Sequence, residues 1–176
     1  MLHKKMTQAL NEQINKEMYS AYLYMSMSNY SALIGLKGFS HWFMAQYHEE
    51  MYHAMKLYGY VQRQGEEVDL KTIKAPPSVF ESPLDMFTQT LAHERYITKS
   101  INDLMELAIS KKDHATQIFL EWYITEQVEE EENDNDIIAQ LKLIGDSPQA
   151  LLMLDRELGG RAVTVPLDFS NGVGEE

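Results

Sequence analysis

The sequence predicts an all-α fold, a four-helix bundle with one long crossover connection and a short fifth helix near the C-terminal end. Four long stretches contain no internal proline and repeat apolar residues at alternating spacings of three and four, which is the period of one helix face. A proline-containing segment separates the second stretch from the third. A short apolar segment follows the fourth.

The first helix is expected over about 5–33. Its inward face carries one acid, Glu17, among mostly apolar residues, where an unpaired carboxylate is costly to bury. Gly35 and Gly38 bracket a short turn. The face consists of Leu10, Ile14, Glu17, Ala21, Tyr24 and Ser28.

The second helix is expected over about 39–64, and Gly65 can supply the left-handed residue that ends it. Glu50 and His53 lie on its inward face, with Glu49 on the flank. This face consists of Phe39, Phe43, Gln46, Glu50, His53, Leu57, Tyr60 and Gln64.

The segment 66–82 includes Pro76 and Pro77 and can extend about 55 Å, farther than a helix of ~40 Å. The third helix therefore need not be antiparallel to the second. Ser82 as a cap and Pro83 as the first helical residue mark its start, and a polar break is expected at 110–113. Its inward face consists of Leu84, Phe87, Leu91, Glu94, Thr98, Ile101, Met105 and Ala108.

The fourth helix is expected over about 114–144. Its inward face consists of Leu120, Tyr123, Gln127, Glu130, Asp134, Ile137, Leu141 and Ile144. A short fifth helix over about 149–158 is apolar nearly all round, so we expect it to meet other subunits. Residues 1–176 are expected to form a single domain, helical from about 5 to 160, with an irregular tail over 161–176.

The chain is acidic, with 15 Lys and Arg against 27 Asp and Glu and a net charge of -12. This balance disfavours nucleic acid as a partner and favours cations, although acidity also serves solubility alone. No apolar stretch approaches the ~18 residues of a membrane span, and the first residues lack a signal-peptide apolar region. We therefore expect a cytoplasmic protein that does not bind membranes.

Metal-ligand side chains interrupt all four inward faces near the middle of each helix. With the crossover placing the third helix parallel to the second, these residues fall within a slab of roughly 9 Å. Buried carboxylates without cationic neighbours would raise one another's pKa values and destabilise the fold, and two divalent cations remove that difficulty. The alternative is a set of ordinary buried polar groups that satisfy each other. The six residues are Glu17, Glu50, His53, Glu94, Gln127 and Glu130.

Oxygen-rich ligands with one imidazole suit iron or manganese better than copper, and zinc can occupy such a site without redox chemistry. Two irons ~4 Å apart could reduce dioxygen together. Tyr24, seven residues from Glu17, is placed to hydrogen-bond to the site or to donate an electron. A packed core tyrosine is the simpler interpretation of the same residue.

With this pattern the chain resembles the bacterial non-haem ferritins over nearly its whole length, and the resemblance implies a ferritin-like fold of four helices, one long crossover and a short fifth helix. The resemblance also implies a first iron position at Glu17, Glu50 and His53. A second is implied at Glu50 and Glu94, with the Gln127 amide nearby. Tyr24 and Trp122 match aromatic residues beside the site. A third, weaker position is implied at Glu49, Glu126, Glu129 and Glu130.

The fourth helix carries Gln127 and Glu130 where many di-iron proteins have a second Glu-x-x-His pair. This departure disfavours bacterioferritin and rubrerythrin. Met51 stands where bacterioferritins place a haem-ligating methionine, but methionine commonly fills cores, so haem is not expected.

The resemblance implies an iron-storage ferroxidase that oxidises Fe(II) with O2 or H2O2 and deposits ferric mineral inside a cage of 24 subunits. A di-iron or di-manganese oxidase of small oligomeric size, and an acidic bundle that binds no metal specifically, are the two other classes compatible with the residues. Spacing alone does not decide among Asp113, Glu121 and Asp134 as residues of a pore through which iron enters.

Overall fold

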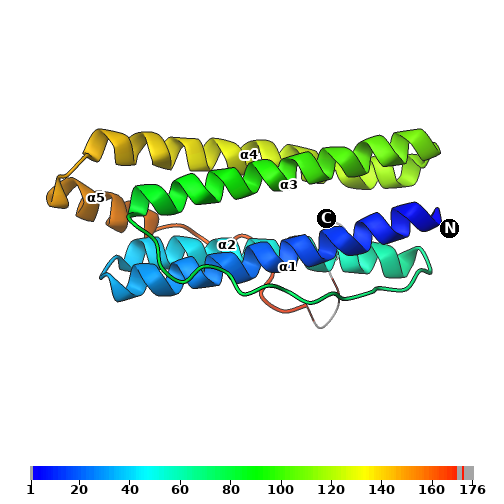
Figure 1. The fold of residues 1–176 in the computed structure, drawn as a ribbon, viewed down its shortest axis with the longest axis horizontal. Coiled ribbons are helices and arrows are strands. Elements are labelled where there is room, and N and C mark those ends of the chain that lie inside the picture. Colours follow the sequence, from blue (N-terminus) through cyan, green and yellow to red (C-terminus); the bar gives the residue numbers. More distant parts are fainter. Residues whose placement is uncertain (1, 170–171, 173–176) are drawn as a thin grey trace.

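The computed structural model describes residues 2–169 and 172, and within them the chain is all-α, as the sequence predicts (Figure 1). The described residues form five helices: α1 (Lys4–Leu33), α2 (Lys37–Arg63), α3 (Pro83–Lys111), α4 (His114–Ile144) and α5 (Pro148–Leu158). No helix in this described part of the chain is both long and apolar enough to span a membrane.

The four long helices form two hairpins, α1 with α2 and α3 with α4 (Figure 1). Between them the crossover, residues 64–82, runs along α1 over most of its length without regular secondary structure. It returns the chain to the end of the bundle where α2 begins, so α3 is parallel to α2. This confirms the expectation drawn from the length of the crossover.

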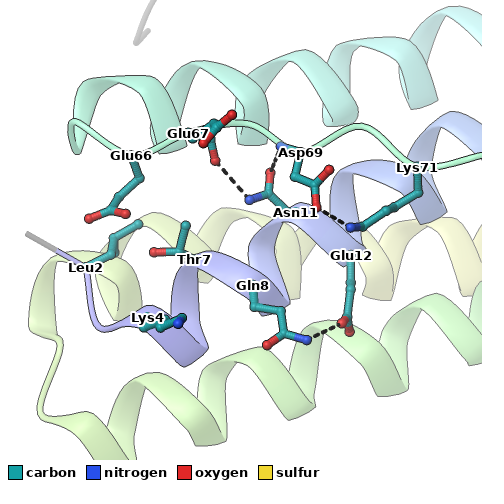
Figure 2. A pocket seen from close by; sticks show the side chains of 10 residues that line it. All are labelled: Leu2, Lys4, Thr7, Gln8, Asn11, Glu12, Glu66, Glu67, Asp69 and Lys71. Atoms are coloured by element: carbon teal, nitrogen blue, oxygen red, sulfur yellow. Dashed lines mark hydrogen bonds and ion pairs between the residues drawn. The ribbon is translucent and has the colours of Figure 1, made fainter.

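Side chains of α1 fix the path of the crossover. The Asn11 side chain donates from Nδ2 to the Glu67 carbonyl at 3.0 Å and accepts from the Asp69 amide at 3.0 Å, as Figure 2 shows on the wall of a surface pocket. Farther along, the Tyr30 hydroxyl donates to the Phe80 carbonyl at 2.5 Å. The crossover is thereby bonded to the bundle near both of its ends, which satisfies backbone groups that no sheet or helix serves.

The ends of α3 and α4 follow local sequence chemistry. Ser82 Oγ accepts from the Asp85 amide at 3.0 Å ahead of Pro83, and Asp113 caps α4 by accepting from the Thr116 amide at 3.1 Å. The polar break is shorter than the predicted 110–113, because α3 continues to Lys111. Lys112 then adopts the left-handed conformation, with φ of 55°, that ends the helix.

Gly38 lies inside α2 and not in the predicted turn, because the helix begins at Lys37. A Cβ at Gly38 would lie 1.5 Å from the Asp155 carbonyl oxygen. Asp155 Oδ1 also accepts from the Gly38 and Phe39 amides, at 2.8 and 3.1 Å, and so caps α2 from α5. The glycine is required by this close approach of two helices.

Helix α5 packs across one end of the bundle (Figure 1). Leu154 and Leu158 are buried, whereas Leu152 is 52 % and Met153 71 % exposed. Half of its apolar surface therefore faces away from the chain's own core. The tail is irregular over 161–169, and the rest of the predicted tail lies outside the described residues apart from 172.

The buried interior has three layers along the bundle axis. One apolar cluster, around Phe39, Phe43 and Phe87, lies at the end that α5 covers, and a second, around Leu10, Leu57 and Leu120, lies toward the opposite end. Between them lie buried polar side chains. The layer contains Gln13, Glu17, Gln46, Glu49, Glu50, His53, Glu94, Gln127, Glu130 and Asp134.

Candidate metal centre

The six predicted metal-ligand residues all lie in the polar layer, and each is at most 4 % exposed. One comes from α1, two from α2, one from α3 and two from α4, so every long helix contributes. Contacts join Glu17, Glu50, His53 and Glu130 to one another and Glu94 to Gln127, and the charges of the two sets act on each other. The sequence prediction that the four interruptions meet at one height agrees with this geometry.

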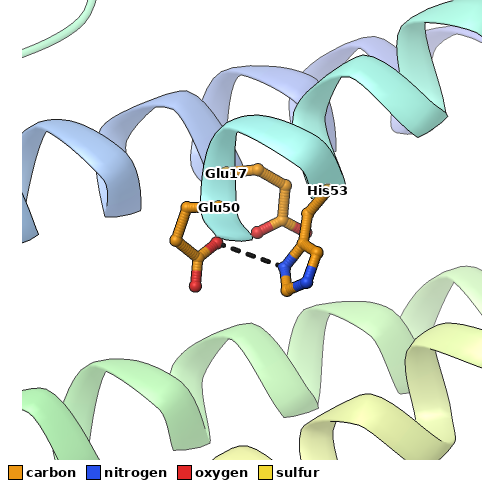
Figure 3. Close-up of side chains that lie close together, drawn as sticks. All are labelled: Glu17, Glu50 and His53. Carbon is orange, nitrogen blue, oxygen red and sulfur yellow. Dashed lines mark ion pairs between the residues drawn. The ribbon is translucent and has the colours of Figure 1, made fainter. Parts of the chain in front are cut away.

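Glu17, Glu50 and His53 make up half of the site. Each offers a ligand atom, and the three atoms all lie within 4.8 Å of one another. Figure 3 shows the three side chains, which come from α1 and α2, converging on the side of these helices that faces α3 and α4. His53 Nδ1 lies 3.4 Å from Glu50 Oε2. The Glu-x-x-His spacing produces this pair because residues three apart share a helix face. The arrangement offers three ligand atoms to a single ion.

Glu94 forms the other half, opposite on α3. It accepts hydrogen bonds from the Tyr24 hydroxyl and, at 3.3 Å, from Gln127 Nε2. Gln127 Oε1 in turn accepts from Thr98 at 3.1 Å, which fixes the orientation of the amide. Tyr24 therefore touches the site directly, and its hydroxyl is not buried among apolar side chains alone.

A further group joins α2 to α4. His53, Glu126 and Glu130 also have ligand atoms within 4.8 Å of one another. Gln46 Nε2 donates to Glu130 Oε2 at 2.9 Å. His53 thus lies between two clusters of carboxylates, one in the core of the bundle and one toward the partly exposed Glu126.

Several carboxylate oxygens in the layer are buried without a hydrogen-bond partner: Glu17 Oε2 and both oxygens of Glu50 and Asp134. Burial, with the neighbouring charges of Glu94, Glu17 and Glu130, raises the pKa of Glu50 well above its ordinary value. Burial and the Glu130 charge raise the pKa of Glu94 likewise. Unpartnered buried carboxylates fit a cation, because a bound ion compensates their desolvation. The donor set therefore suits hard or borderline divalent metals.

Gln13 is a residue of the layer that sequence reasoning missed. Its Nε2 donates to Glu17 Oε1 at 2.9 Å, and its Oε1 accepts from the Ser100 hydroxyl at 2.5 Å. Lys16 Nζ donates to the same hydroxyl at 2.5 Å. This chain of bonds orients the amide so that it faces Glu17 as a donor. Gln13 lies four residues before Glu17, one helical turn away, which is the only signal the sequence offers.

The model of the ferritin-like domain family matches residues 7–144. The chain is 42 % identical to the bacterial non-heme ferritin of Campylobacter jejuni over 164 residues, covering 93 % of this chain and 98 % of that protein. It is 41 % identical to the bacterial non-heme ferritin of Staphylococcus epidermidis over 92 % of this chain and 98 % of that one.

This chain is a member of the ferritin family. Among solved structures, an engineered closed form of the Archaeoglobus fulgidus ferritin superposes with a TM-score of 0.92 at 49 % identity, covering 93 % of this chain and all of that one. A humanized archaeal ferritin superposes with a TM-score of 0.93 at 50 % identity, covering 94 % of this chain and all of that one. The resemblance stated from the residues is confirmed.

The residues implied for a third iron position of this ferritin are less uniformly placed. Glu126 and Glu130 belong to the His53 cluster, whereas Glu129 is exposed and belongs to neither cluster in the described residues. Glu49 is 8 % exposed and bonded to Arg161. Met51 is half-buried on α2. Trp122 packs against His53, with ring centroids 5.4 Å apart.

The three residues considered for an iron pore differ in their surroundings. Asp134 is 1 % exposed and lies within the bundle, so in this chain it is part of the polar layer and not of the surface. Asp113 is engaged in capping α4. Glu121 is exposed, so of the three it alone has a side chain both at the surface and outside a helix cap.

Proposed function

We propose that this ferritin binds Fe(II) in the polar layer, oxidises it there with O2 or H2O2, and stores the ferric product inside a hollow assembly. The observation that carries the proposal is the cluster of Glu17, Glu50 and His53, in which Glu17 Oε2 and both Glu50 oxygens are buried without a hydrogen-bond partner. Membership in the ferritin family supports iron storage and ferroxidase activity in general.

In this proposal Glu17, Glu50 and His53 hold one iron, and Glu94 with Glu50 holds the second. Glu50 serves both, which its position between the Glu17 and Glu94 charges supports. Gln127 holds Glu94 in place by its hydrogen bond. A third, weaker position is proposed at Glu49, Glu126, Glu129 and Glu130, of which Glu129 is exposed.

Side chains of the site balance the charge of the ferrous substrate and bind or release protons when it arrives. Burial raises the pKa values of Glu50 and Glu94, so these groups hold protons more strongly than free carboxyl groups do, and iron binding favours release of those protons. Burial and the Glu94 charge raise the pKa of Tyr24 well above its ordinary value, so its hydroxyl remains a donor to Glu94. Iron supplies the electrons that reduce the oxidant. Gln13 keeps the Glu17 carboxylate turned toward the metal.

The storage cage is proposed to contain 24 subunits in the cytoplasm. The exposed Leu152 and Met153 of α5 give this helix an apolar face suited to contact with other copies of the chain. A charge of -12 per subunit would make such a shell strongly acidic, which concentrates cations and favours mineral nucleation. Neither nucleic acid nor a membrane enters this proposal.

The test is an aerobic titration of the purified protein with ferrous iron, followed by size analysis and an iron count per particle. We expect rapid oxidation and retention of hundreds of irons in a particle of several hundred kilodaltons, as multi-subunit closure requires. Saturation at two or three irons per chain in a small oligomer would instead make the protein a soluble oxidase. Absence of specific iron binding would leave only an acidic bundle.

A further inference from the structure

The C-terminal end of α5 is fixed against the beginning of α2. Asp155 caps α2 through the Gly38 and Phe39 amides, and Gly38 leaves the room for this approach. One turn beyond Leu158, the backbone of Arg161 is held by a 2.8 Å hydrogen bond between its carbonyl and His41 Nε2. The first residue of the tail therefore has a defined place beside α2.

From this place the Arg161 side chain runs along α2 to Glu49. Its guanidinium carbon lies 4.7 Å from the centre of the Trp42 ring, and its Nη2 donates to Glu49 Oε2 at 2.6 Å. Trp42 and Glu49 are seven residues apart, two turns along one face. The two charged side chains are only 20 % and 10 % exposed. A charge-assisted bond at this depth is much less screened than a surface ion pair.

The carboxylate that Arg161 holds is Glu49 of α2, which interacts with the charges of two acids of α4. Burial, together with the charges of Glu130 and Glu126, raises the pKa of Glu49 to about 7. The Arg161 charge opposes this rise. Burial and the Glu130 charge raise the pKa of Asp134 to about 8, and the Arg161 charge partly opposes that rise. Arg161 Nη1 is buried with no hydrogen-bond partner. The guanidinium thus places a positive charge beside a group of side chains that are otherwise acidic.

We propose that Arg161 is a built-in counter-cation that occupies Glu49 and competes with a metal ion for it. The proposal rests on the third metal position of the proposed function. Arg161 occupies Glu49 Oε2, so a metal ion that uses this oxygen together with Glu126 and Glu130 displaces the guanidinium from it. The affinity of this position then depends on the C-terminal segment. Arg161 acts through Glu49 and is a positioning residue. By linkage, loading this position releases the Arg161 side chain from the bundle.

The test uses Zn²⁺, which is redox-inert, in calorimetric titrations of the assembled protein. For the parent we expect two tight ions per chain and a weaker third. Arg161→Gln removes the competing charge and should tighten the third position by about tenfold, toward the lower end of the usual range of coupling between sites. Arg161→Lys keeps the charge and should stay near the parent. Arg161→Met, which retains an unbranched stem over Trp42, repeats the test without charge if the amide disturbs assembly.

Two further variants separate this role from a structural one. Arg156→Gln removes an exposed arginine of α5, five residues before Arg161, and should titrate like the parent. Glu49→Gln combined with Arg161→Gln should abolish the gain. A third position that stays unchanged or weakens in both Arg161→Gln and Arg161→Met would overturn the proposal while leaving the two tight ions in place. A parent that binds no tight zinc would overturn the proposed function, and this inference with it.

Discussion

Replacing Glu50 with alanine is expected to abolish rapid iron oxidation while the assembly remains intact. Glu50 is the carboxylate that both proposed iron positions share, and neither of its oxygens has a hydrogen-bond partner, although Oε2 lies 3.4 Å from His53 Nδ1. Its loss should slow oxidation at least about 100-fold, the upper end of what loss of an outer-shell partner costs. Stopped-flow absorbance after mixing with ferrous iron measures the rate, and size analysis measures assembly.

Stability distinguishes this variant from a misfolded one. Because the charges of Glu94, Glu17 and Glu130 oppose ionisation of Glu50, its removal relieves repulsion, and the metal-free melting temperature should stay level or rise. Glu132→Ala removes an exposed acid of α4 and is the matched control, expected to oxidise at the parent rate. Oxidation at the parent rate in Glu50→Ala would show that the chemistry lies elsewhere.

Metal-free protein is expected to lose stability as the pH rises from about 5 to 8. Burial raises the pKa of Asp134 from 3.8 to about 8, and that of Glu49 from 4.5 to about 7. Between the unfolded and folded pKa values the folded protein binds more protons than the unfolded chain, so the free energy of unfolding falls as pH rises. The melting temperature should drop by roughly 5 °C or more over this interval.

Two comparisons test the cause of this pH dependence. Asp134→Asn should flatten the curve, whereas Asp136→Asn, an exposed neighbour on α4, should not. Zn²⁺ should raise the melting temperature more at pH 8 than at pH 5, because it binds deprotonated carboxylates. A metal-free melting temperature that rises steadily from pH 5 to 8 would contradict the buried, proton-binding state of the layer.

The sequence predicted the bundle and the residues that lie together in the candidate site, because helical period and ligand chemistry point to the same positions. An acid in the middle of an apolar face, as at Glu17 and Glu94, is readable from spacing alone. The crossover could also be predicted from the sequence, because the segment is long enough to span the bundle and the Pro76-Pro77 pair excludes a helix there.

Contacts between distant elements were not readable in the same way. The predicted turn at Gly38 was wrong because the glycine serves a close contact with Asp155, 117 residues away. Gln13 was not singled out from the sequence, because its orientation depends on a hydrogen bond from Ser100 of another helix. Arg161 fell in the expected irregular tail, and no periodicity connects it with Glu49. Such pairings depend on tertiary geometry, which a local pattern does not encode.

The most direct test of the account is diffraction from crystals loaded anaerobically with Fe(II), measured at the iron absorption edge. The account predicts two anomalous peaks per chain inside the bundle, one bounded by Glu17, Glu50 and His53 and the other by Glu50 and Glu94. A weaker peak beside Glu49 and Glu130 should strengthen in Arg161→Gln. Peaks found only on the outer surface, with none between Glu17 and Glu94, would contradict it.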